Sequence, residues 1–472
     1  MFKTLRGRRR GFVGMGVALG ISAMVVSVAL PAGAAVSPAA NNTLINAGSN
    51  TTYQMMAQLS ALFGQVPGCD LVPASGTQNL DFSCPSNDGE TNGAPTPGGE
   101  NGYTLSYPSP NPYNDVSVTE PAFGSSGGID QLEYQGADIP SSNTPIVAPI
   151  SFARSSRAAS TTSGTGDKSG LNFVAYAQDA VPWFHFTKVK GKKTPSAKVT
   201  NLSTTTLTGI YDGSITNWDN SAIGGTNAPI YVYIAQSSSG TFSTWDTDLD
   251  LGPKSNYPYD GVTGSGTGDA STGCPASDFE IFENEDSQIL SPSCSKANAA
   301  DAIFFFSYGK FTLLCPKGVC EGSSKTTVAA LGEIGGVAAS PATIQAQSSG
   351  SGTVFPLDRY LYNVYSNGTN SNLPAASQPV ENFISTYGFL CNPQTKTEVD
   401  PLSSTGATYL TEIDNIISEE GFFPITLGPE GDTATGVTPP SFTDPNYSAA
   451  DPAPSGDSGY CRVTTTNGDG NS

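Results

Sequence analysis

The sequence contains a single histidine, His185, among 472 residues. A hydrolase with a Ser-His-Asp triad would have to use this residue as its base. His185 lies within the apolar and aromatic run 181–186, which favours a packed histidine in the core. The two serine-rich runs, 123–128 and 235–241, also lack the Gly-x-Ser-x-Gly pattern of a nucleophile elbow. The sequence therefore argues against a triad hydrolase.

Paired carboxylates can act without histidine, and a hydrolase of this kind is a third alternative. Glu419 and Glu420 are the clearest pair, but adjacent side chains point in different directions on a helix. A solvated helix end explains them better. The sequence thus favours a protein that is not an enzyme, with no cofactor and no resident metal.

Basic residues are scarce: there are 21 Lys and Arg against 41 Asp and Glu, a formal net charge of -20. Five of the basic residues lie within the first ten positions, in a segment that we expect to be removed. The remaining chain is therefore still more acidic, which argues against nucleic acid or an anionic membrane as partner. Charged residues are only 13% of the chain, whereas Ser, Thr, Asn, Gly and Pro abound, a composition typical of extracellular proteins.

The apolar run at 13–30 follows a basic stretch and precedes the small-residue cleavage pattern at 32–34. This order predicts a cleavable export signal over 1–34 and a mature chain that begins near Ala35. Glycines interrupt the run, so removal is favoured over a retained anchor, and no stable membrane insertion is expected. The pair 9–10 also fits a twin-arginine signal, with general secretion as the alternative. We expect a secreted or cell-surface bacterial protein without a lipid anchor, because no cysteine stands at the cleavage site.

All eight cysteines lie in the exported part, where an even count in an oxidising compartment indicates disulfides. Pairing of neighbours in the sequence gives the bridges 69–84, 274–294, 315–320 and 391–461. Other connectivities stay open, since eight cysteines allow 105 complete pairings. A zinc site at Cys315 and Cys320 is the less favoured alternative, because no histidine lies nearby.

Apolar runs and polar turns alternate in an α/β pattern. The first unit is a short strand at 44–45, a polar turn at 46–52 and a helix at 53–63, whose apolar residues recur at helical spacing. Further strands are expected at 116–123, 146–152, 171–183, 230–234, 302–308 and 355–365, and helices around 207–218, 279–290 and 379–387.

Two regions have the composition of loops. The stretch 64–115 is rich in Pro, Gly, Asn and Ser and contains two cysteines, which predicts a disulfide-pinned insertion. The segment 428–472 is a low-complexity tail with little expected regular structure apart from a tether at Cys461.

The serine-rich runs 123–128 and 235–241 place hydroxyls and glycine backbone just ahead of segments expected to be helical. Helix starts expose free N–H groups and bind anions. A small acidic ligand is therefore the first expectation.

Several such pieces occur in one order along the chain, and in this order they resemble the phosphate-type substrate-binding proteins of ABC transporters. This family is part of the type 2 periplasmic-binding-protein-like superfamily, and the chain is similar to its enlarged secreted relatives in actinobacteria. The matching pieces are 48–53, 124–128, 153–157, 207–218, 239–241, 306–309 and 420–424.

The resemblance implies an α/β fold of two lobes, which are joined by two crossovers and close over a ligand. The first lobe would comprise 40–155 and, after the chain returns, 352–427. The second lobe would comprise 156–351. The implied function is capture of an inorganic oxyanion, with phosphate favoured, and an ABC permease is a candidate partner.

Family members hold phosphate with hydroxyls and backbone N–H groups from loops at helix starts. Neutral donors suffice there because each helix start adds partial positive charge. Carried over to matching positions, the resemblance implies a ligand site made of Ser49, Asn50, Thr51, Ser125, Ser126, Arg154, Ser156, Ser239, Gly240 and Thr241.

Two charged family positions are not matched. The aspartate that accepts the proton of hydrogen phosphate falls at Ser156, and the arginine falls near Ala235 or Gln236. Arg154 or Arg157 is the expected substitute cation. A serine hydroxyl can either donate or accept, so Ser156 predicts weak discrimination between phosphate and sulfate. The alternative function is a secreted surface or adhesion module that keeps the fold without transport.

Overall fold

The computed structural model describes the chain over residues 46–63, 72–73, 80–81, 124–134, 150–160, 167–236, 238–251, 279–292, 297–320, 323–349, 352–371, 373–376, 378–385, 388–391, 399, 403–425 and 461–465. The chain divides into two compact units, Met1–Ser37 and Pro38–Ser472, and every described residue belongs to the second. The expected export signal, the strand expected at 116–123 and the bridges expected at 69–84 and 274–294 lie outside the described residues.

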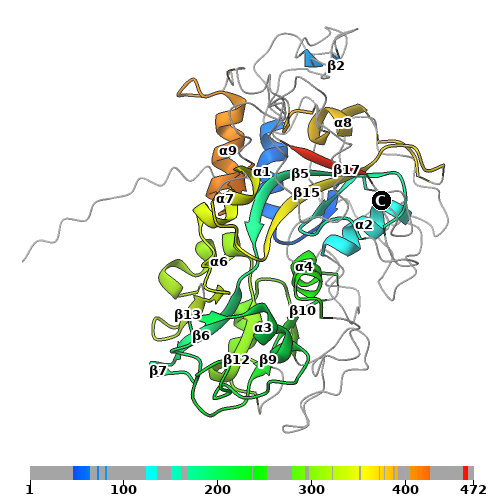
Figure 1. Cartoon of the computed structure of the whole chain (residues 1–472). Helices are drawn as coiled ribbons and strands as arrows, with labels where there is room; N and C mark the ends of the chain where they lie inside the picture. Colours follow the sequence, from blue (N-terminus) through cyan, green and yellow to red (C-terminus); the bar gives the residue numbers. More distant parts are fainter. Residues whose placement is uncertain are drawn as a thin grey trace, which may run out of the picture. The chain divides into compact units, whose positions relative to one another are not determined.

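The first sheet has the strand order β1-β4-β15-β5-β16, and β17 also pairs with β5. Figure 1 labels β5, β15 and β17 of this sheet. β1 is parallel to β4, whereas β15 is antiparallel to both β4 and β5. Segments far apart in the sequence therefore form one sheet. Its strands are β1 (Asn46–Gly48), β4 (Phe152–Ser155), β5 (Leu171–Ala180), β15 (Asp358–Ser366), β16 (Phe423–Pro424) and β17 (Arg462–Thr465).

Apolar side chains alternate between the two faces of β5, as the period of two in a strand requires. Phe173 and Ala175 join one core cluster, whereas Val174 and Tyr176 join another. One face is covered by α1 (Tyr53–Phe63), α8 (Gln378–Ile384) and α9 (Tyr409–Glu419), and the other by α2 (Ser125–Tyr134). The sheet is thus the middle layer of an α/β lobe.

The second sheet has the strand order β13-β6-β12-β9, with β7 paired to β6. Its core is rich in aromatic side chains, and Phe305 stacks on Trp245 with ring centroids 5.0 Å apart. The strands are β6 (Trp183–Val189), β7 (Lys192–Lys193), β9 (Tyr231–Val232), β12 (Ala302–Phe305) and β13 (Val328–Leu331), and the helices packed here include α3 (Thr204–Tyr211), α4 (Gly240–Asp248) and α6 (Tyr308–Leu314).

The remaining elements lie outside these two sheets. They are β2 (Val72–Pro73), β3 (Leu80–Asp81), β8 (Asn201–Leu202), β10 (Ile234–Ala235), β11 (Glu280–Ile281), α5 (Asp286–Leu290), η3 (Ala299–Asp301), η4 (Pro316–Gly318), β14 (Glu333–Ile334) and α7 (Pro341–Ser349). In the described part of the chain, no helix combines the length and the apolar character needed to cross a membrane.

The helix expected at 53–63 is found as α1, and the strands expected at 171–183, 302–308 and 355–365 are found with shifted or earlier ends. Two expectations need correction. The turn expected at 46–52 does not begin at 46, because Asn46–Gly48 form β1 and pair with β4; the strand expected at 44–45 lies outside the described residues. Only Asp286–Leu290 of the helix expected around 279–290 is helical, since the preceding residues form β11 beside β10.

The chain crosses between the sheets at two adjacent places. It leaves β5 at Ala180 and enters β6 at Trp183, and it returns at Asp358 of β15. The Val181 N–H donates to the Leu357 carbonyl at 2.9 Å, so the two crossing segments are hydrogen-bonded to each other. Because β5 pairs with β15 along its whole length, we move the border of the first lobe from the expected 155 to 180.

The described part of the chain contains the disulfides Cys315–Cys320 and Cys391–Cys461, both as expected. The second bridge ties the tail to the first lobe, and the residues that follow Cys461 form β17 on β5. This short strand lies at the tether expected at Cys461.

Peptide mapping of the secreted protein without reduction should recover both disulfide-linked peptides and no alkylated cysteine. The reason is that both bridges are formed and their sulfurs are buried, with Cys391 and Cys461 at 0% and 2% exposure. A cysteine that reacts with an alkylating agent before reduction would contradict this expectation.

Candidate functional site

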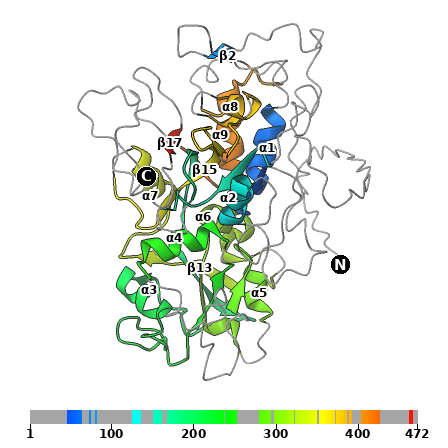
Figure 2. The ribbon, with the colours of Figure 1, turned by 90° about the vertical axis from the view of Figure 1, so that its right-hand side faces the viewer.

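The starts of α2 and α4 meet through their backbones (Figure 2). The Ser126 N–H donates to the Ser238 carbonyl at 3.1 Å. Gly124 makes this approach possible, because a Cβ there would lie 2.0 Å from the same carbonyl oxygen. α2 begins in the first lobe and α4 in the second, so the contact joins the two serine-rich runs.

Three buried serine hydroxyls form a cluster at this junction. Ser49 Oγ donates to Ser156 Oγ at 3.0 Å, and Ser125 Oγ lies 3.3 Å from Ser156 Oγ. The Ser156 N–H donates to Ser125 Oγ at 2.8 Å. Gly240 closes over the cluster, since a Cβ at this position would lie 2.2 Å from Ser125 Oγ and 2.6 Å from Ser156 Oγ. The β1–α1 loop, the start of α2, the end of β4 and the start of α4 therefore converge.

Glu283 extends this cluster with a carboxylate. Its two oxygens accept hydrogen bonds from the hydroxyls of Thr51 and Ser239, the latter at 2.5 Å. Ser239 is also the N-cap of α4, because its hydroxyl accepts from the Phe242 N–H at 3.1 Å. Glu283 follows β11 in the second lobe, whereas Thr51 precedes α1 in the first. The carboxylate thus bridges the lobes.

Arg359 brings a positive charge to the cluster. Its Nη1 donates to Thr241 Oγ1 at 2.8 Å and to the Ser156 carbonyl at 3.1 Å. Its Nε and Nη2 donate to Asp179 Oδ2, and the side chains of the pair are 4% and 0% exposed. Asp179 also accepts from the Ser307 hydroxyl and the Gly309 N–H at the start of α6. The ion pair lies next to both crossovers, because Asp179 is near the end of β5 and Arg359 is near the start of β15.

The two arginines expected as substitute cations have other partners. Arg154 Nη1 donates to Asn46 Oδ1, its Nε donates to the Ser49 carbonyl at 3.4 Å, and its guanidinium lies over the Tyr53 ring. Arg157 forms two hydrogen bonds with Asp167 at 2.9 and 2.8 Å, and its Nε donates to Ser126 Oγ. Arg154 thus contacts the loop that carries Ser49, and Arg157 contacts the start of α2.

The structure brings most of the expected site residues together. Ser49, Thr51, Ser125, Ser156, Ser239, Gly240 and Thr241 lie in the cluster, each buried. Ser126 reaches it through its backbone contact with Ser238, and Asn50 is half-buried in the same loop as Ser49. Their contact with a ligand stays a prediction.

Sequence reasoning missed Arg359, Asp179 and Glu283. A serine-rich helix start can be recognised in the sequence, but these three residues stand at the ends of strands or in a loop without a motif. The one available signal is that charged residues stand within apolar strand segments, as Asp179 and Arg359 do. Charged side chains are rarely buried without a partner, so each predicts an oppositely charged neighbour.

His185 is a core residue, as expected. It is 2% exposed, its Nδ1 lies 2.8 Å from Ser196 Oγ, and its ring packs on Trp183. Burial lowers the pKa of His185 to about 3, so the ring is neutral at physiological pH. His185 lies in β6, and its contacts are with Ser196 and Trp183 rather than with the hydroxyl cluster.

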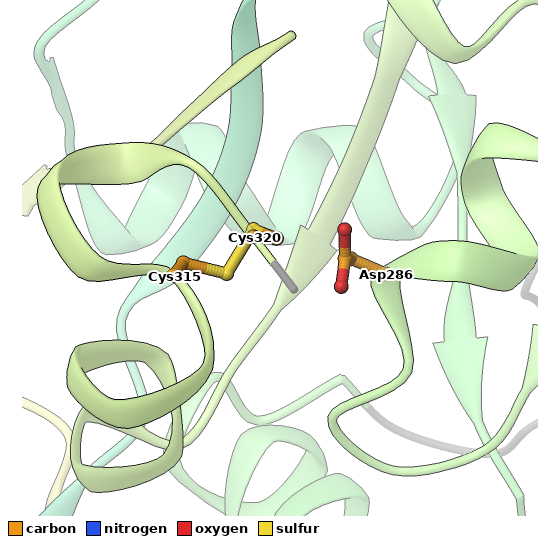
Figure 3. A group of neighbouring side chains, drawn as sticks. All are labelled: Asp286, Cys315 and Cys320. Atoms are coloured by element: carbon orange, nitrogen blue, oxygen red, sulfur yellow. A yellow bond between two sulfur atoms is a disulfide. The ribbon is translucent and has the colours of Figure 1, made fainter. Parts of the chain in front are cut away.

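A second group of neighbouring side chains consists of the Cys315–Cys320 disulfide and Asp286 (Figure 3). The carboxylate of Asp286 faces the bridge, and the potential ligand atoms of the three residues lie within 4.8 Å of one another. Burial raises the pKa of Asp286 to about 6. Zinc is bound by thiolates, whereas these sulfurs are bonded to each other, so the donor set does not fit a zinc site. The group is a cross-link beside a buried carboxyl.

The family model described as the PBP superfamily domain matches residues 108–288. Over these residues the match agrees with the superfamily to which the resemblance pointed. The two sheets and the two crossovers agree with the expected two-lobed α/β fold. The matched segment contains Ser125, Ser156, Ser239 and Glu283, whereas Arg359 lies beyond it.

Solved structures with 14–17% sequence identity are similar to the chain. A protein from Clostridium perfringens, described as a candidate phosphate ABC transporter substrate-binding protein with bound phosphate, has a TM-score of 0.42 and 15% identity over 82% of this chain and 100% of its own. An ABC-type phosphate transport receptor from Vibrio cholerae has a TM-score of 0.41 and 17% identity over 80% and 99%. A phosphate-binding protein from Stenotrophomonas maltophilia has a TM-score of 0.39 and 14% identity over 81% and 91%. None of the curated proteins matches the chain.

Proposed function

We propose that the chain is an extracellular solute-binding protein that captures an inorganic oxyanion, with phosphate favoured, between its two lobes. The observation that carries this proposal is the buried cluster in which the Ser49 and Ser125 hydroxyls meet that of Ser156. The buried guanidinium of Arg359 joins this cluster at the Ser156 carbonyl and the Thr241 hydroxyl. Hydroxyls, helix starts and one arginine are the donors that suit a tetrahedral oxyanion.

In the proposed cycle, the lobes separate at the adjacent crossovers and close again over the ligand. Ligand oxygens take the place of the contacts that the hydroxyls make with one another, such as Ser49 Oγ to Ser156 Oγ. Arg359 needs no movement to take part, because Asp179 already fixes its guanidinium. Such preorganisation lowers the cost of ordering the site on binding.

The superfamily match over 108–288 supports binding without catalysis. Secretion rests on the export signal expected at 1–34, and an ABC permease partner is a further part of the proposal. Titration calorimetry with phosphate, sulfate and a panel of sugars tests the proposed ligand class. Binding of none of these by the intact secreted protein would favour the adhesion alternative.

Thr241→Val is expected to weaken phosphate binding by about 1.5–3 kcal/mol, the range for a hydrogen bond that involves a charged group. Valine has nearly the same shape as threonine but removes the hydroxyl that meets Arg359 Nη1. Thr247→Val on the exposed side of α4 is the matched control and should leave the dissociation constant unchanged. Equal affinities of the Thr241 variant and the wild type would place Thr241 outside the binding site.

A further inference from the structure

We infer that the hairpin of β6 and β7 is a docking surface for a linear phosphate polymer outside the cell. The surface consists of Lys188, Lys190, Lys192 and Lys193, which we call the lysine hairpin, and all four residues are exposed. It belongs to the second sheet and shares no residue with the hydroxyl cluster. The inference therefore does not depend on the proposed oxyanion site.

The lysine hairpin concentrates positive charge on an acidic chain. Four of the 16 basic residues beyond position 10 stand within 188–193, and no Asp or Glu stands between Asp179 and Asp212. The ion pairs formed among the described residues involve Arg157, Lys310 and Arg359, so none of them neutralises the hairpin. Its charge is available to an anionic partner, although the chain as a whole is acidic.

The local structure does not account for these lysines. Lys188 lies directly opposite Lys193 across the antiparallel pair, and like charges in this arrangement destabilise a sheet. Lys190 and Gly191 form the turn, with φ of 50° and 80°, and Asn, Asp or Gly is preferred at the first of these positions. Lysines that conflict with their local structure indicate a function for the surface.

The turn of the lysine hairpin is held by the segment that precedes β13. The Gly191 N–H donates to the Thr326 carbonyl at 2.8 Å, and the Lys190 N–H donates to Thr327 Oγ1 at 3.3 Å. Lys325 is also exposed in this segment and adds a fifth positive charge. The lysines are thus presented by a fixed backbone.

The lysine hairpin is remote from the crossovers along its strand. β6 begins at Trp183, just after the first crossover, and ends at Val189 before the turn. A strand rises about 3.3 Å per residue, so the turn lies roughly 20 Å along β6 from the crossover. A polymer bound at the turn would leave the lobes free to separate and close.

The types of residue on the hairpin indicate the chemistry of the partner. Protein interfaces are enriched in arginine and aromatic residues and depleted in lysine. Single-stranded nucleic acid stacks its bases on aromatic rings, and segments that lie in a membrane surface present Trp, Phe or Leu. Residues 187–193 contain no arginine, aromatic residue or leucine. Lysine binds phosphate as a point charge, so the hairpin suits a polymer that offers closely spaced phosphates and no other feature.

The test is fluorescence anisotropy of end-labelled, long-chain inorganic polyphosphate, titrated with the intact secreted protein at several salt concentrations. The logarithm of the wild-type binding constant should fall with the logarithm of the salt concentration with a slope of about -3, because each of four neutralised phosphates contributes about -0.7. A variant that combines Lys188→Gln, Lys190→Gln, Lys192→Gln and Lys193→Gln should bind at least about 100-fold more weakly at low salt.

Changing the same four lysines to arginine is the matched control, because the charge is kept and the affinity should stay close to that of the wild type. The urea midpoint of the glutamine variant should equal or exceed that of the wild type, since repulsion between the lysines is removed. No binding of polyphosphate by the wild type, or equal binding by the glutamine variant, would overturn the inference. Tighter binding of an oligothymidylate with the same number of phosphates, or of phosphatidylglycerol vesicles, would overturn it in favour of nucleic acid or a membrane.

Discussion

Arg359→Ala is expected to lower the free energy of unfolding by about 3–5 kcal/mol, the usual range for removing one partner of a buried ion pair. Asp179 has a fully buried side chain, and without the guanidinium its charge would be left without a cation among the described residues. The same change removes the donor that reaches Thr241 and the Ser156 carbonyl. We therefore expect loss of measurable phosphate binding as well as lower stability.

Urea denaturation at pH 7 measures the first effect, and titration calorimetry well below the unfolding transition measures the second. Lys193→Ala is the control, since Lys193 is an exposed cation on β7. Arg359→Lys separates the two roles, because lysine restores a positive charge beside Asp179 but lacks the forked donors that reach two acceptors. A urea midpoint of Arg359→Ala equal to that of the wild type would contradict the structural role of the pair.

The α/β class and much of the element order could be predicted because each element leaves a local pattern. The apolar spacing of α1 and the serine-rich starts of α2 and α4 are examples. The turn expected from residue 46 was placed too early, because Asn46–Gly48 pair with β4, which follows about a hundred residues later in the chain. Local sequence does not encode such a register.

The same contrast between local patterns and contacts between distant segments explains which site residues could be predicted from the sequence. Hydroxyl-bearing loops are contiguous motifs and could be assigned one by one from the family resemblance. Arg359 and Glu283 reach the cluster from β15 and from the loop after β11, and only the folded chain brings them near Thr241 and Thr51. The sequence therefore pointed to Arg154 and Arg157, which flank Ser156, as the missing cation. In the structure Arg154 donates to Asn46 and Arg157 donates to Asp167.

Glu133 near the end of α2 is a buried carboxyl whose ionisation the fold disfavours. Burial raises the pKa of Glu133 to about 8 from its ordinary 4.5, and the negative charges of Asp167 and Asp130 act in the same direction. The Lys168 N–H, which donates to Glu133 Oε1 at 2.6 Å, and the Lys168 charge oppose them. α2 also carries Ser125 and Ser126 at its start, so this carboxyl affects how firmly the site helix is held.

The pKa of Glu133 is higher in the folded than in the unfolded chain, so its protonated form stabilises the native state fully below about pH 4.5 and this contribution is lost as the pH rises through about 8. At 1.36 kcal/mol per unit of pKa difference, the loss is roughly 3–5 kcal/mol. Glu133→Gln mimics the neutral form and keeps an acceptor for the Lys168 N–H. The variant should match the wild type at pH 4 and be more stable by roughly this amount at pH 9 in urea denaturation. Glu419→Gln, at an exposed position of α9, should follow the wild type at both pH values. A Glu133→Gln variant whose stability changes with pH as steeply as that of the wild type would show that this carboxyl ionises as freely in the folded chain as in the unfolded one.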